Sequence, residues 1–224
     1  MVRVSQSVGE RGSLKWIQKA INQSPSRKLD ELILPELTGA RCIAWSSPIS
    51  SDDHAEYRDA AFLEKIGAPN LKADLSKFWP SRGPQWDALG RSDNDDVLLV
   101  EAKAHIAEIC SPPTGARPVS LKTIEAALTE TASHLGAKPR AKWTEAFYQL
   151  NNRLAHLYFL RKHGVKAWLV LVNFVSDAEM QGPTSPREWE AAYKVVWHVL
   201  GIEARNPLSK YIVHVYPTVS DLAS

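Results

Sequence analysis

The sequence predicts an α/β fold in which a mixed central β-sheet is flanked by helices. Two short apolar runs, 97–100 and 167–175, are typical of strands that are buried on both faces of a sheet. Segments with apolar residues at helical spacing lie before, between and after these two strands. This arrangement indicates helices packed around a sheet, so we expect an α/β domain over 41–224, preceded by an N-terminal extension over 1–40.

Composition limits the class of protein. The chain has 224 residues, a net charge of +2 and 44% hydrophobic residues, values that are ordinary for a soluble globular protein. The charge is only mildly basic, so any contact with nucleic acid must come from local patches. Cys42 and Cys110 match no zinc-ligand spacing or disulfide framework, which favours a cytoplasmic location. The longest apolar run is too short to span a bilayer, so we expect no membrane segment.

The first part of the chain gives few strong signals. Residues 1–12 carry no periodic pattern, and a short helix is expected over 14–22, where the Ser-Pro-Ser at 24–26 ends it. The apolar segment 29–37 is interrupted by a proline and fits either a helical turn or an edge strand. Residues 41–45 are expected to form a short strand.

The next expected element is a helix from Asp53 to Ile66, which Gly67 closes. Glu56 lies beside the apolar stripe of this helix and could form a capping box with Asp53. Asp59 lies within the stripe, where a buried acid would need a partner. The segment that follows, up to Arg82, is expected to be irregular.

The later elements have clear start or stop signals. They are a helix from Leu121 to Gly136, a helix over 143–163, a strand over 167–175, a helix from Ser185 to Leu200 and a strand over 211–216.

The stretch from Gln85 to His105 is the part of the chain that suggests chemistry. Turn-forming residues at 92–96 separate two strand-like segments, so we expect a hairpin centred near Asn94, whose second strand ends near Ile109.

Two carboxylates and one ammonium are expected to converge at the end of this hairpin. Asp87 lies opposite Glu101, and opposed residues have Cβ atoms roughly 4.5–5.5 Å apart. Lys103 shares the face of Glu101 because strand side chains alternate. Close carboxylates require a cation, and oxygen ligands favour Mg²⁺ or Mn²⁺. The alternative is that Glu101 and Lys103 simply pair with each other or protect a sheet edge.

The spacing of Asp87, thirteen residues, Glu101, one residue and Lys103 resembles the PD-(D/E)XK nuclease superfamily. The resemblance implies a restriction-endonuclease-like core in which Asp87 and Glu101 bind the metal and Lys103 positions the attacking water. Members often carry a further metal-site glutamate on the first helix, and Glu56 matches that place. Its capping role remains the alternative. Trp86 stands where the motif has proline, which changes none of the chemical groups.

The helix over 143–163 carries a polar stripe opposite its apolar face. The stripe consists of Gln149, Asn152, Arg153 and His156. Amide, guanidinium and imidazole groups can bind phosphates and base edges, so we expect these residues to contact the substrate. An ordinary solvated surface is the alternative. Gln149 is similar to the glutamine of RecB-like members, although their tyrosine four residues later is Arg153 here.

These observations predict metal-dependent phosphodiester hydrolysis of nucleic acid, in the first place by a DNA endonuclease. The alternative is a non-catalytic nucleic-acid-binding or scaffold protein that retains the nuclease fold. A Ser/His hydrolase is disfavoured because the sequence contains no G-x-S-x-G elbow. The expected cofactor is Mg²⁺ or Mn²⁺, the expected partner is DNA, and the protein could act as a homodimer.

Overall fold

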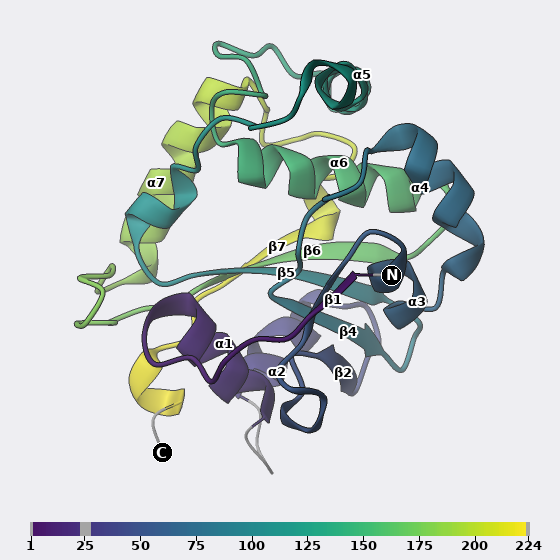
Figure 1. The fold of residues 1–224 in the computed structure, drawn as a ribbon. Coiled ribbons are helices and arrows are strands. Elements are labelled where there is room, and N and C mark those ends of the chain that lie inside the picture. The colour runs from purple at the N-terminus through teal and green to yellow at the C-terminus, as the bar shows by residue number, and fades with distance from the viewer. Residues whose placement is uncertain (1, 23–27, 223–224) are drawn as a thin grey trace.

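The computed structural model describes residues 2–22 and 28–222 of the chain. Its strands and helices are β1 (Val2–Val4), α1 (Gly12–Asn22), α2 (Lys28–Ile33), β2 (Ile43–Ser47), β3 (Glu56–Arg58), α3 (Ala60–Lys65), α4 (Lys72–Phe78), β4 (Ala88–Ser92), β5 (Val97–Lys103), α5 (Pro118–His134), α6 (Tyr148–Lys162), β6 (Ala167–Asn173), α7 (Pro186–Leu200) and β7 (Ile212–Val215). The predicted α/β class is confirmed, because helices flank a five-stranded mixed sheet (Figure 1). The helix stop expected at 24–26 lies outside the described residues.

The strands of the main sheet lie in the order β2-β4-β5-β6-β7. β2, β4 and β5 are antiparallel neighbours, whereas β5, β6 and β7 run parallel. Parallel neighbours need a crossover connection, which α5 and α6 provide between β5 and β6, and α7 between β6 and β7. β5 therefore has a partner on each side, as its unbroken apolar run predicts.

The side chains of β5 alternate between two hydrophobic cores. Leu98 and Val100 pack into the core that α1 and α2 cover. Leu99 packs into the larger core on the other face of the sheet. Glu101 and Lys103 continue the set of Leu99, because side chains two apart on a strand share a face. They therefore emerge at the end of β5 under the larger helical layer.

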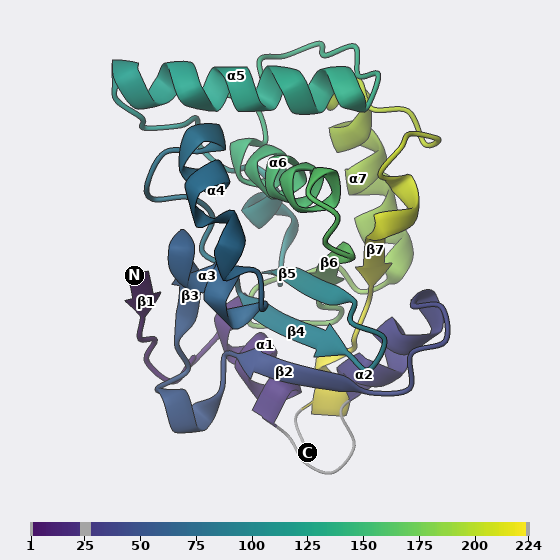
Figure 2. The ribbon, with the colours of Figure 1, turned by 90° about the vertical axis from the view of Figure 1, so that its right-hand side faces the viewer.

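Two helical layers enclose the sheet. α4, α6 and α7 lie on one face with α5 outermost, and α1 and α2 lie on the other (Figure 2). Ile17, Ile21 and Leu29 are fully buried in the core that contains Leu98. Burying each such side chain stabilises the fold by about 1.5–3 kcal/mol. The described part of the expected extension, 1–40, thus supplies one layer of the fold.

A second, two-stranded sheet joins the N-terminus to the region before β4. β1 pairs antiparallel with β3, with Val4 opposite Glu56. Tyr57 of β3 forms an isolated antiparallel bridge with Trp86. This bridge places Glu56 beside the residues that lead into β4. Neither strand was expected from the sequence.

The expected helix from Asp53 to Ile66 is wrong in its first half. Asp53, His54 and Asp59 have φ angles of 49°, 48° and 54°, a left-handed conformation that interrupts a right-handed helix. Residues 56–58 form β3, and only α3 is helical. The apolar spacing suggested a helix, but the long-range pairing of β3 with β1 decides the local structure.

Three other boundaries differ from expectation. The segment 71–82, expected to be irregular, contains α4. β5 ends at Lys103 rather than near Ile109. α6 begins at Tyr148 rather than at Trp143, after a turn in which Phe147 is left-handed. The segment 29–37, for which two interpretations were open, is helical in α2 and a 3₁₀ turn.

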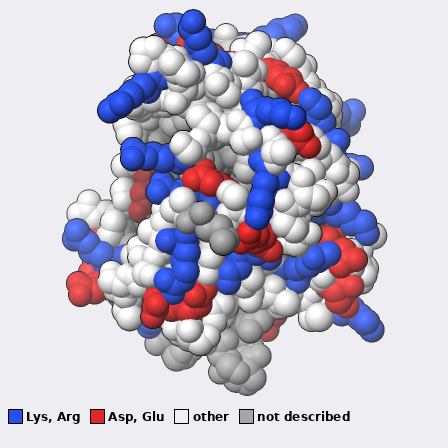
Figure 3. Space-filling model, turned by 45° about the vertical axis from the view of Figure 1, so that its right-hand side comes forward, with Lys and Arg blue, Asp and Glu red and all other residues white. Residues whose placement is uncertain are grey.

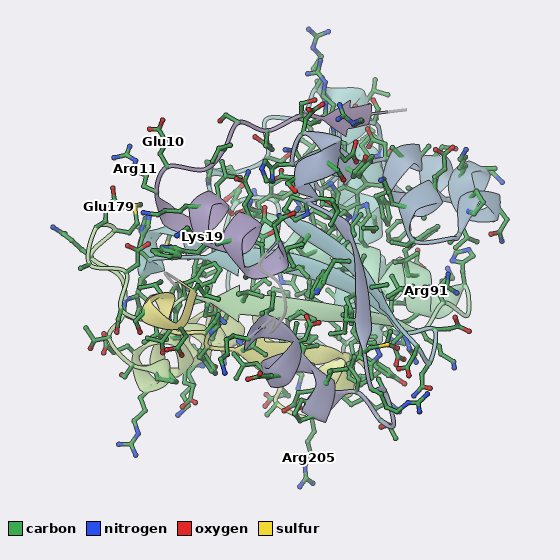
Figure 4. All side chains as sticks on the ribbon, turned by 90° about the horizontal axis from the view of Figure 1, so that it is seen from below. Glu10, Arg11, Lys19, Arg91, Glu179 and Arg205 are labelled. Carbon is green, nitrogen blue, oxygen red and sulfur yellow. The ribbon has the colours of Figure 1, made fainter. Side chains whose placement is uncertain are left out.

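Charges of both signs are interspersed on the surface, as the face in Figure 3 shows. In the view from below, Glu10, Arg11, Glu179 and Arg205 project away from the ribbon (Figure 4). Among the described residues, the helices are all too short or too polar to cross a membrane.

Candidate active site

A cleft of about 740 Å³ lies where β5 ends. Its walls come from the end of β5, the loop that precedes β4, the segment 111–115 and the first turns of α6. These parts are distant in sequence and meet because β5 is central and α6 packs over it. The cleft contains most of the residues that the sequence singled out.

Asp87 lies one residue before β4, on the wall of this cleft. The hairpin pairs Ala88 with Val100, and this register continued by one residue places Asp87 opposite Glu101. The backbone amide of Ala102 donates a hydrogen bond of 2.7 Å to Oδ2 of Asp87. No described residue donates a hydrogen bond to Oδ1, so this oxygen is available to a ligand in the cleft.

Glu101 is buried between two cations and does not itself line the cleft. Lys103 Nζ lies 2.5 Å from its Oε1. Arg153 Nε lies 2.6 Å from its Oε2. Removing one partner of such a buried ion pair typically destabilises a protein by about 3–5 kcal/mol, because it leaves a buried charge uncompensated.

Arg153 is held entirely by the protein. Its Nη1 donates to Asn152 Oδ1 and its Nη2 to the carbonyl of Gln85, both at 2.8 Å, in addition to the contact with Glu101. The guanidinium also lies 5.0 Å from the centre of the Trp86 ring. Arg153 was expected to bind substrate phosphates. Three of its five N–H donors are used within the chain, where the buried Glu101 needs a cation, and the residue also borders the cleft.

Lys103 is linked to α6 through Gln149. Its Nζ donates to Gln149 Oε1 at 2.9 Å, and the backbone amide of Gln149 donates to Ser111 Oγ at 2.9 Å. The side chain of Lys103 keeps 12% of its surface exposed, towards the cleft. The lysine is therefore positioned by neighbours on two elements and still reaches the solvent of the cleft.

Glu56 lines the same cleft, but from β3 rather than from a helix. Its Oε2 accepts hydrogen bonds from Gln85 Nε2 at 2.5 Å and Gln6 Nε2 at 2.9 Å. The side chain therefore does not cap a helix at Asp53. The resemblance placed Glu56 beside Asp87 and Glu101 on a helix; it does lie at this cleft, but on the strand β3.

The polar stripe of α6 divides. Gln149, Asn152 and Arg153 line the cleft, whereas His156 does not. The His156 ring is buried 5.0 Å from the Trp79 ring, and its Nδ1 bonds the carbonyl of Asn152 at 2.8 Å. The expectation that His156 contacts substrate is therefore wrong. Side chains on several faces of α6 are buried, so of the four polar residues His156 is confined to internal contacts, whereas the other three also border the cleft.

The pKa values of Asp87 and Glu101 are shifted in opposite directions. Burial raises the pKa of Asp87 to about 8, and the nearby charge of Glu101 adds to this effect. Burial also opposes ionisation of Glu101, but Arg153 and Lys103 outweigh it and lower the pKa of that carboxyl. Burial disfavours the charged form of Lys103, yet Glu101 and Asp87 raise its pKa overall. Burial raises the pKa of Glu56.

The carboxylates of Asp87 and Glu101 can accommodate a hard divalent ion if Lys103 gives access to Glu101 Oε1. Within the described ranges, no cluster of three or more His, Cys, Asp or Glu side chains is arranged to hold a metal. Mg²⁺, however, is commonly bound through one or two carboxylates and several waters. Oδ1 of Asp87 is free, and a carboxylate has about four lone-pair positions, of which Lys103 and Arg153 use two at Glu101. Asp87 and Glu101 therefore fit such an ion if Lys103 shares or leaves Oε1.

Comparisons with known proteins identify no relative: no family model, no curated protein and no solved structure matches the chain. Sequence reasoning missed Gln6, Gln85 and Ser111, which position site residues. Gln85 lies two residues before Asp87. Gln6 and Ser111 are distant in sequence and carried no signal.

Proposed function

We propose that the chain is a metal-dependent nuclease of the PD-(D/E)XK superfamily that hydrolyses phosphodiester bonds in DNA. The observation that carries the proposal is the placement of Asp87 opposite Glu101, with Lys103 on the same face, at the edge of an open cleft. A mixed sheet flanked by helices is the scaffold that the restriction-endonuclease-like fold would provide. Both features agree with the sequence motif.

In this proposal Asp87 and Glu101 would hold one Mg²⁺ or Mn²⁺. The ion would acidify a water and neutralise charge on the scissile phosphate. Lys103, which lines the cleft, would orient the attacking water, and Gln149 holds the lysine by accepting a hydrogen bond from Nζ. Asp87 keeps one oxygen open to the cleft while the Ala102 amide fixes the other.

A non-catalytic role is the second candidate, and one observation favours it. Both oxygens of Glu101 are engaged by Lys103 and Arg153, so the buried charge is balanced without any ion. A scaffold or nucleic-acid-binding protein would retain such an ion pair for its stability alone. The two candidates differ in whether the purified protein cleaves.

The test is cleavage of plasmid, single-stranded DNA and RNA by the purified protein in Mg²⁺, Mn²⁺ or EDTA. Lys103→Ala is compared with Lys166→Ala, which removes an exposed lysine at the other end of the sheet. We expect metal-dependent cleavage of DNA by the wild type and by Lys166→Ala, and at least a 100-fold loss in Lys103→Ala. Cleavage of none of the substrates, or equal cleavage by both variants, would contradict the nuclease proposal.

We also propose a cytoplasmic location. Its support is that Cys42 and Cys110 are both free and exposed, as expected in a reducing compartment. Labelling of both thiols in freshly isolated protein, without a reductant, would test it.

A further inference from the structure

The two cations beside Glu101 are held in different ways. Arg153 uses Nε, Nη1 and Nη2 for three separate partners, and 4% of its side chain is exposed. Lys103 has one further hydrogen bond, to Gln149, and lies at the open end of β5. Moving Arg153 would leave three acceptors without this donor, whereas moving Lys103 would leave two, on Glu101 and Gln149.

Arg153 is also a permanent charge. A guanidinium stays protonated at all physiological pH values, and its planar fork matches a carboxylate better than an ammonium does. The Nε of Arg153 contacts Oε2 of Glu101, the oxygen that Lys103 does not contact. One oxygen of Glu101 is therefore closed by a fixed cation, and the other is covered by a cation that can withdraw.

We propose that Arg153 acts as a built-in cation at Glu101 Oε2, so that the site takes one divalent ion, between Asp87 and Glu101 Oε1, and not two. The inference rests on the proposed nuclease function, because only that function requires a divalent ion. It makes Arg153 a positioning residue, which holds Glu101, and not a substrate contact.

The charges of the site support a single ion. Counted as formal charges, the carboxylates of Asp87, Glu101 and Glu56 contribute −3 and the side chains of Lys103 and Arg153 contribute +2, which leaves −1. One divalent ion brings this total to +1, and a second would bring it to +3. Like charges repel strongly in a partly buried site, where the effective dielectric is well below that of water. A second ion would have to overcome this repulsion without a free oxygen of Glu101.

The experiment is to count bound Mn²⁺ on the full chain after treatment with EDTA. Calorimetry gives the affinity and stoichiometry, and electron paramagnetic resonance of free Mn²⁺ gives an independent count. Arg153→Gln removes the cation, and Arg153→Lys retains a charge. Arg161→Gln is the matched control, since it removes an arginine from the same helix about 12 Å further along (eight residues at roughly 1.5 Å each).

We expect one ion in the wild type, in Arg153→Lys and in Arg161→Gln. Arg153→Gln should bind its first Mn²⁺ at least about tenfold more tightly and should accept a second, because the competing charge is gone and Oε2 is free. Its DNA cleavage should nevertheless fall, since Glu101 loses the contact that orients it. Tighter binding combined with slower turnover is a result that general unfolding cannot produce, because unfolding weakens both.

Other outcomes overturn the inference. Two ions in the wild type, reduced to one in Glu56→Gln, would place a second ion at Glu56 and leave the nuclease proposal standing. An unchanged affinity and count in folded Arg153→Gln would show that the arginine does not limit the site. No Mn²⁺ binding by the wild type would overturn this inference and the metal-dependent function together, and the cleavage assay would then show independently whether any nuclease activity exists.

Discussion

Replacing Asp87 with Asn should change how the stability of the protein depends on pH. In the folded protein, burial first and the charge of Glu101 second raise the pKa of Asp87 to about 8. In the unfolded chain an aspartate titrates near pH 3.9 (approximately, for model peptides). Between these values the folded state holds a proton that the unfolded state has lost. Folding stability therefore falls as the pH rises through this window, and levels off above about pH 8.

The size of the effect follows from the linkage between protonation and folding. One proton of difference changes the free energy of unfolding by about 1.4 kcal/mol per pH unit, so the ceiling between pH 5 and pH 8 is about 4 kcal/mol. The carboxylate of Asp87 is partly exposed in the cleft, so we expect about half of this ceiling. Asp87→Asn lacks the titrating group and keeps an oxygen that can accept from the Ala102 amide.

The assay is urea unfolding of both proteins in EDTA at several pH values between 5 and 8.5. The stability of Asp87→Asn relative to the wild type should rise by about 2 kcal/mol across this range, half the linkage ceiling. Asp93→Asn is the control: a hydrogen bond from the Arg41 backbone amide lowers the pKa of Asp93, so its contribution is lost only in more acidic solution. A difference for Asp87→Asn that stays constant over the range would show that Asp87 does not bind this extra proton in the folded protein.

Three further predictions follow from particular residues. Burial lowers the pKa of His156 to about 3, so the folded protein loses stability as the pH falls below about 6.5, by up to about 1.4 kcal/mol per pH unit. His156→Leu should lack this pH dependence in urea unfolding between pH 4 and 7. A Cβ at Gly182 would lie 2.2 Å from the Ala104 carbonyl oxygen, so Gly182→Ala should destabilise by about 1–3 kcal/mol, whereas Gly115→Ala, with open space around it, should not. At pH 7, below the pKa of about 8 for Asp87, Mg²⁺ binding should release most of one proton from this carboxyl, which calorimetry in buffers of different ionisation enthalpy measures.

The central part of the fold could be predicted from sequence because its signals are local. The unbroken apolar runs of β5 and β6 indicate strands buried on both faces. Turn-forming residues between β4 and β5 set the hairpin and therefore the opposition of Asp87 and Glu101. Ser185, Pro186 and Gly201 mark the ends of α7.

The parts that could not be predicted depend on contacts between distant segments. β3 forms because β1, about fifty residues earlier, pairs with it, and no local pattern encodes that pairing. His156 was interpreted as part of a binding surface because sequence periodicity does not reveal that Trp79 packs against it. The ion pair of Arg153 with Glu101 follows from the rule that a buried charge needs a partner, which had led us to expect a cation between Asp87 and Glu101.

The proposed function depends on a divalent ion between Asp87 and Glu101. Crystals soaked in Mn²⁺, with diffraction measured near the manganese absorption edge, test it most directly. We predict one anomalous peak within ligand distance of Asp87 Oδ1 and Glu101 Oε1, with Lys103 moved off Oε1 and Arg153 unmoved, and no peak in Asp87→Asn crystals. A cleft without a peak, with Glu101 still paired to both cations at saturating Mn²⁺, would show that Asp87 and Glu101 do not bind a divalent ion.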